Sequence, residues 1–192
     1  TPLYSSAASD VYKRQERRKW KKIRDKVSQL LSDEISNTFA DFSLILIPPQ
    51  VFMIESEDKA QQLEELRKKT RDHQMTQLNR LAQGDWKQIK QRLTEEEHLL
   101  SGGYGGLFDR RYTNLNDIEL KYSKFLDPST LKPLIDLERL LKSLSSNINV
   151  RVKLKAQAVG AAFAPEYDDK IAYRVHEIMK TLSEFKKFGI LK

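Results

Sequence analysis

Three histidines are the first residues to consider for acid–base or metal chemistry, because the chain contains no cysteine. His73, His98 and His176 fall on three different predicted helices, and none lies in a motif such as two histidines four residues apart with an intervening glutamate. His98 follows three glutamates, residues 95–97, a cluster that could bind a metal ion, but an exposed acidic helix surface explains the same run. We therefore expect no metal site, no cofactor and no catalytic histidine.

Two pairs of carboxylates have a spacing that general acid–base catalysis could use. Glu34 and Asp41 are seven residues apart and share one face of a predicted helix, whereas Asp168 and Asp169 fall in the first turn of another. Acidic residues in a first turn interact favourably with the helix dipole, and this interaction stabilises the helix by about 1 kcal/mol or less. Neither pair carries a specific signal of catalysis, and we expect that the protein is not an enzyme.

The glycine-rich segment SGGYGG, residues 101–106, could present backbone amides to a phosphate group. It lacks the Gly-Lys-Ser/Thr ending and the preceding strand of a phosphate-binding loop. Four of the seven glycines lie here, and glycine loses the most conformational freedom when it is ordered, so we predict a loop or hinge. The next segment, FDRRY, places Arg110 and Arg111 between two aromatic residues and is a weaker candidate for binding an acidic partner or stacking on bases.

The strongest candidate for a binding site is the basic segment ERRKWKKIRDKV, residues 16–27. Tryptophan among lysine and arginine is typical of a membrane interface, where the cations bind anionic headgroups. Cations at a helix N-terminus oppose the helix dipole, so either the helix continues upstream or an anionic partner compensates. A solvated helix end is the alternative that needs no partner. The candidate residues are Arg17, Arg18, Lys19, Trp20, Lys21, Lys22, Arg24 and Lys26.

The charge of the chain is distributed unevenly. The net charge is +7, and all of it lies in residues 13–26, because basic and acidic side chains balance over the rest of the chain. A globally basic nucleic-acid-binding domain would not show this distribution. The longest apolar stretch, residues 42–54, is too short to cross a bilayer and is interrupted by two prolines.

Residues 5–15, SSAASDVYKRQ, are similar to the adapter-derived peptide found at the ends of some assembled reading frames. They are mostly small and polar and show no hydrophobic period. We therefore expect residues 1–15 to be non-native. On this interpretation an upstream part of the protein, which could include a transmembrane segment, precedes residue 16.

Apolar residues at spacings of three and four predict a long amphipathic helix over residues 16–46, which a double proline ends. Ser56 is the predicted N-cap of a second helix. Gly84 is the predicted C-cap of that helix, and Asp85 with Gln88 is predicted to form a capping box for a third.

Further helices are predicted after the glycine-rich segment. Asn114 is the predicted cap of one helix, Asp127 with Pro128 begins another, and Pro165 begins the last. Residues 150–156 alternate as a strand would but also fit a helix face, which we favour, so residues 150–163 remain open between the two. The last helix has the 4, 3, 4, 3 spacing of a bundle or coiled-coil seam, which suits packing within the chain and dimerisation equally well. Its members are Ile171, Val175, Ile178, Leu182 and Phe185.

These patterns predict an all-α protein of five to six helices, with a long basic amphipathic helix at residues 16–47 and a helical bundle domain at residues 48–192. We expect a non-enzymatic scaffold or interaction domain, the cytosolic, membrane-proximal part of a membrane-anchored protein. Its partners would be an anionic membrane surface or an upstream transmembrane segment, and a protein or a second copy bound through helix seams. Two alternatives are a helical protein whose basic segment binds nucleic-acid phosphates and a non-catalytic subunit of an enzyme complex.

Overall fold

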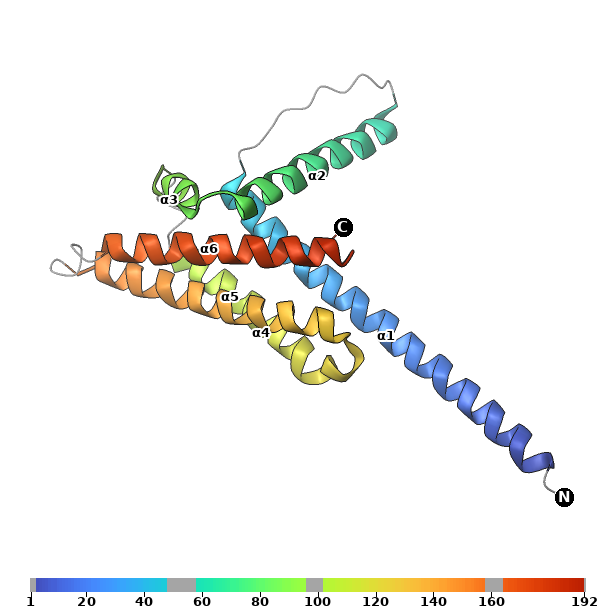
Figure 1. Ribbon diagram of the computed structural model, residues 1–192. Helices are drawn as coiled ribbons and strands as arrows, with labels where there is room; N and C mark the ends of the chain where they lie inside the picture. The colour runs from blue at the N-terminus through green and yellow to red at the C-terminus, as the bar shows by residue number, and fades with distance from the viewer. Residues whose placement is uncertain (1–2, 48–57, 96–101, 158–163, 192) are drawn as a thin grey trace.

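The computed structural model describes residues 3–47, 58–95, 102–157 and 164–191, and over these residues the chain is helical and contains no strand (Figure 1). The predicted fold class, a helical bundle with a long first helix, is confirmed. In chain order the elements are α1 (Leu3–Leu46), α2 (Lys59–Gln83), α3 (Trp86–Glu95), α4 (Gly102–Tyr122), the 3₁₀ turn η2 (Ser123–Phe125), α5 (Pro128–Lys155) and α6 (Ala164–Lys187).

Helices α4, α5 and α6 form the centre of the bundle. α5 packs against both α4 and α6, and α5 and α6 run side by side (Figure 1). Every residue of the predicted 4, 3, 4, 3 seam in α6 is buried within the chain, so this seam is intramolecular. The facing residues of α5 are also buried, namely Leu134, Leu137, Leu141, Leu144 and Ile148.

The ends of α5 and α6 follow from local residue chemistry. Asp127 occupies the N-cap position of α5 and Pro128 its first position, as predicted, although the Asp127 side chain makes no capping hydrogen bond. α6 is followed by Gly189 at φ 69°, a conformation that glycine adopts without strain. Residues 150–155 continue α5, so the helical alternative is correct for them, while residues 158–163 lie outside the described residues.

The ends of α2 and α3 also depend on short polar side chains and glycine. Asp58, rather than the predicted Ser56, is the N-cap of α2, and its carboxylate accepts a hydrogen bond of 2.9 Å from a backbone N–H in the first turn. Gly84 is the C-cap, as predicted. Asp85 accepts a 3.0 Å hydrogen bond from a backbone N–H in the first turn of α3, and two residues separate α2 from α3.

Helix α1 begins at Leu3 rather than near residue 16, and it has two parts. Its second part packs on the bundle through Leu31, Ile35, Phe39 and Phe42, which are all buried. Its first part, residues 3–26, which we call the arm, passes the turn η2 and then extends away from the bundle toward the N-terminus (Figure 1). Side chains 11–22 of the arm are all exposed. At about 1.5 Å per residue the arm is about 35 Å long.

The glycine-rich segment predicted as a hinge at residues 101–106 is instead helical from Gly102 onward, so that prediction is wrong for residues 102–106. Gly105 lies against α5, where the Ser145 hydroxyl donates a 2.8 Å hydrogen bond to its carbonyl oxygen. A Cβ atom at Gly105 would lie 2.5 Å from the amide oxygen of Asn149. Close packing of α4 on α5 thus offsets the conformational cost of glycine. Because α4 begins at Gly102, Asn114 lies in the middle of this helix, and its prediction as a cap is wrong.

Candidate anionic-surface binding site

The basic segment, residues 16–27, lies on the arm and on the turn of α1 that follows it. Because α1 begins at Leu3, the cations lie well inside the helix, and their expected conflict with the dipole at a helix N-terminus does not arise. Within the described part of the chain, none of the seven basic side chains of this segment forms an ion pair. Every predicted site residue of the segment is exposed, and so are the acidic residues Glu16 and Asp25. The exposed site residues are Arg17, Arg18, Lys19, Trp20, Lys21, Lys22, Arg24 and Lys26.

Trp20 is 46% exposed and contacts a residue far away in the sequence. Its ring centroid lies 5.2 Å from that of Phe125 in η2, with the ring planes inclined at 41°. The Lys124 ammonium lies 5.9 Å from the Trp20 centroid and 5.1 Å from the Phe125 centroid. η2 therefore adds an aromatic ring and a cation to the site, and no periodicity or motif in the sequence connects residue 20 with residues 124 and 125.

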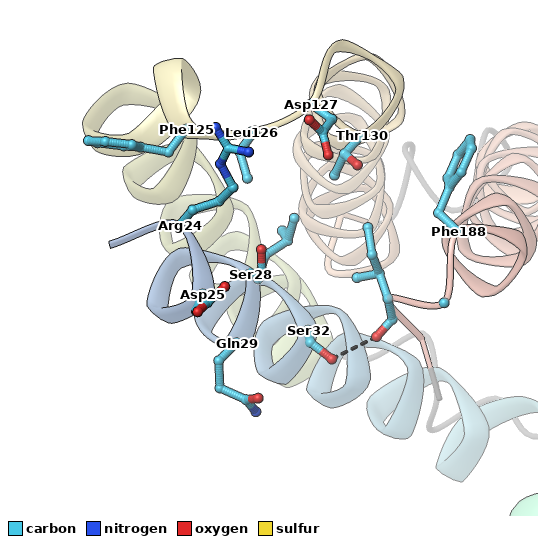
Figure 2. A pocket seen from close by; sticks show the side chains of 13 residues that line it. Arg24, Asp25, Ser28, Gln29, Ser32, Phe125, Leu126, Asp127, Thr130 and Phe188 are labelled. Atoms are coloured by element: carbon cyan, nitrogen blue, oxygen red, sulfur yellow. Dashed lines mark hydrogen bonds between the residues drawn. The ribbon is translucent and has the colours of Figure 1, made fainter. Parts of the chain in front are cut away.

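A pocket of about 390 Å³ lies where α1 passes the start of α5 and the end of α6 (Figure 2). Arg24 of α1 and Phe125 of η2 both line it. At one side of the pocket the Ser32 hydroxyl donates a 2.7 Å hydrogen bond to the carbonyl oxygen of Ile190. This contact attaches α1 to the chain just after α6, close to the point where the arm leaves the bundle.

A group of charged side chains attaches the second part of α1 to α4. Arg111 donates to Asp41 at 2.6 Å and to Glu34 at 3.1 Å, and the three side chains are between 12% and 16% exposed. Burial alone would lower the pKa of Arg111, but hydrogen bonds to the two carboxylates raise it above its ordinary value. Glu34 and Asp41 thus share a helix face, as predicted, and the structure gives them a role in packing that the sequence did not indicate.

The FDRRY segment is mostly occupied within the bundle. Arg111 is held by α1, and the Phe108 ring stacks on Phe42 with centroids 4.7 Å apart. Arg110 alone of the two arginines is exposed. The two arginines therefore do not form a common surface for an acidic partner.

The remaining candidates for chemistry are dispersed. Asp168 forms an ion pair with Arg151, and Asp169 forms one with Lys90 at 2.6 Å. His176 is 7% exposed, and neither of its ring nitrogens has a hydrogen-bond partner in the described part of the chain. His98 lies outside the described residues. Among the residues that the structure describes, no three histidine or acidic side chains lie close enough together to hold a metal ion.

Glu138 of α5 is a buried carboxyl group that the sequence analysis did not identify. It is 4% exposed, and its Oε1 atom has no hydrogen-bond partner among the described residues. Burial raises the pKa of Glu138 to about 7, and the charge of Glu119 and a hydrogen bond with that residue add to the shift, while Arg139 opposes it. Glu119 of α4 and Glu138 of α5 lie where these two helices pack together, so the protonation state of Glu138 affects the stability of the bundle.

Comparison with known proteins finds no match to a protein family, to a curated protein or to a solved structure. Within the described ranges, none of the helices combines the length and the apolar composition needed to cross a bilayer.

Proposed function

We propose that the protein is a non-enzymatic helical interaction domain that its arm holds on an anionic membrane surface. The observation that carries this proposal is the exposure of seven basic side chains together with Trp20 on a helix segment that extends beyond the bundle. The bundle buries its own α6 seam, so a protein partner would bind its remaining surface.

The electrostatics of the arm supports a polyanionic surface as the partner. Arg17 and Lys21, Arg18 and Lys22, and Lys22 and Lys26 are each four residues apart, a spacing at which like charges destabilise a helix by about 0.2–0.5 kcal/mol per pair. Anionic headgroups would relieve this repulsion and attract each cation by about 1 kcal/mol. A net charge of +5 in the basic segment then gives about 5 kcal/mol, a submillimolar affinity for lipid.

Vesicle cosedimentation tests the proposal. We expect the protein to sediment with phosphatidylcholine vesicles that contain phosphatidylserine, and not with phosphatidylcholine alone. Replacing Arg17, Arg18, Lys21 and Lys22 by Gln should remove about 4 kcal/mol of binding, roughly a thousandfold. A control with the same loss of charge replaces four exposed lysines of the bundle, Lys68, Lys142, Lys153 and Lys180, and should bind as the parent does. Equal binding by both variants would contradict the proposal.

Nucleic acid is the second candidate, and one observation favours it. Arg17, Arg18 and Lys19 are consecutive, so they point in three directions about 100° apart, and cations surround much of the arm instead of forming one face. Competition separates the two candidates. Duplex DNA or RNA that binds at moderate salt and displaces the protein from vesicles, while vesicles do not displace it from the duplex, would replace the membrane by nucleic acid as the partner.

A further inference from the structure

A groove lies between the arm of α1 and the turn η2, close to the point where the arm leaves the bundle. Its volume is about 460 Å³. The lining combines aromatic rings and cations from two parts of the chain, with one acidic side chain among them. The residues that matter here are Glu16, Lys19 and Trp20 from α1, and Lys124 and Phe125 from η2.

We propose that this groove binds phospholipid headgroups at the membrane surface, with Trp20 and Phe125 in the interfacial layer and Lys19 and Lys124 on lipid phosphates. The inference rests on the proposed function and extends the membrane contact from the arm to η2, which belongs to the bundle. A membrane bound in this way would fix the orientation of the bundle as well as that of the arm.

The aromatic contact suits a bilayer interface. The Trp20 side chain is nearly half exposed although it is in contact with Phe125, and Phe125 is itself only partly buried, so apolar surface of both rings remains in water. Tryptophan rings are enriched at the headgroup level, where one part of the ring is apolar and another hydrated. Lys124 lies over both rings, so insertion of these rings into the interfacial layer would bring its ammonium group close to lipid phosphates.

Charge and geometry disfavour two other occupants. A second copy of the chain would bring two basic segments together, each with a net charge of +5, and the repulsion would oppose such a dimer. A nucleobase would need an open ring face on which to stack. Phe125 already covers part of the Trp20 ring and is tilted by 41° against it. Anionic lipid meets neither objection, because its charge attracts the basic segment and its binding does not require stacking on an open ring face.

The test uses Trp20 as its own reporter. In a Trp86→Phe background, Trp20 is the single tryptophan, and its emission should shift to shorter wavelength when vesicles containing phosphatidylserine are added. We expect Lys124→Gln to weaken vesicle affinity about fivefold, the loss for one cation near an anionic surface. Lys142→Gln is the matched control, because Lys142 also lies over an aromatic ring, 5.1 Å from the Tyr112 centroid, but away from the arm.

Two further variants alter the two sides of the groove. Glu16→Gln removes the acidic group of the groove and should strengthen binding about fivefold, which checks the sign of the electrostatic contribution. Because Glu16 also lies on the arm, the arm proposal predicts the same gain, and the variants in η2 distinguish the two proposals. Phe125→Ala should weaken binding and reduce the emission shift, whereas Tyr173→Ala, at an exposed aromatic residue of α6, should change neither.

The outcomes distinguish the two proposals. If the variant with four arm substitutions loses binding while Lys124→Gln and Phe125→Ala both bind as the parent does, the groove proposal is overturned and the arm proposal stands. If the parent protein does not bind anionic vesicles, the proposed function fails and the groove proposal fails with it. Weaker binding by Lys124→Gln but not by Lys142→Gln, with stronger binding by Glu16→Gln, supports both.

Discussion

Two neighbouring glycines in α4 give a sharp test of how the glycine-rich segment folds. Gly105 is buried against α5, whereas a Cβ atom added at Gly106 would meet nothing within 4 Å. Gly106→Ala should therefore stabilise the protein by about 0.5–1 kcal/mol, because alanine is the better helix former by that amount. The same exchange at Gly105 should have the opposite effect.

The magnitude at Gly105 follows from its neighbours on α5. The new methyl group would lie 2.5 Å from the oxygen of the Asn149 amide and 3.1 Å from its carbon, so either this side chain or the helix must move. Such overpacking costs about 1–3 kcal/mol. Separation of the helices would also weaken the hydrogen bond from Ser145 to the Gly105 carbonyl, worth about 1 kcal/mol. After the gain in helix propensity, we expect a net loss of about 1–2 kcal/mol.

Urea denaturation followed by circular dichroism at 222 nm measures both effects. In a chain of this size 1 kcal/mol corresponds to a change of about 2–4 °C in Tm, so thermal unfolding gives a second reading. Adding Asn149→Ala to Gly105→Ala removes the clashing amide and should recover most of the loss. If Gly106→Ala destabilises the protein as much as Gly105→Ala does, the segment is a hinge as the sequence suggested, and the helical interpretation is refuted.

Two further predictions concern ionisable groups. The pKa of Glu138, about 7, lies above its ordinary value of 4.5, so the folded state binds the proton more tightly, and stability present below pH 4.5 is lost as the pH rises toward 7. Glu138→Gln should therefore raise the free energy of unfolding at pH 8 by about 3 kcal/mol at most and change it little at pH 4.5. Urea titrations at the two pH values measure this difference, and equal destabilisation at both would contradict the prediction. Arg111→Met should cost about 2–3 kcal/mol, because it leaves two partly buried carboxylates facing each other. The exposed neighbour Arg110→Met should change stability by less than about 0.5 kcal/mol in the same titration.

The sequence by itself determined the all-α fold, the apolar faces of α5 and α6, and several helix ends. Each of these depends on residues within a few positions of one another. Spacings of three and four select the buried face of Leu137 or Ile178, and Pro128, Gly84 and Gly189 act on the backbone at their own positions. The exposure of the basic segment was also predictable, since burying so many cations without partners would cost too much.

Only the tertiary structure decided where packing changes a local preference and which distant residues contact each other. Glycines 102–106 have a local preference for a loop, but contact with Ser145 and Asn149 keeps them in α4. The partners of Trp20 and Glu34 lie on segments far away in the sequence, Phe125 on η2 and Arg111 on α4. Such contacts leave no periodic pattern, because helix packing sets which distant residues meet and local chain geometry does not.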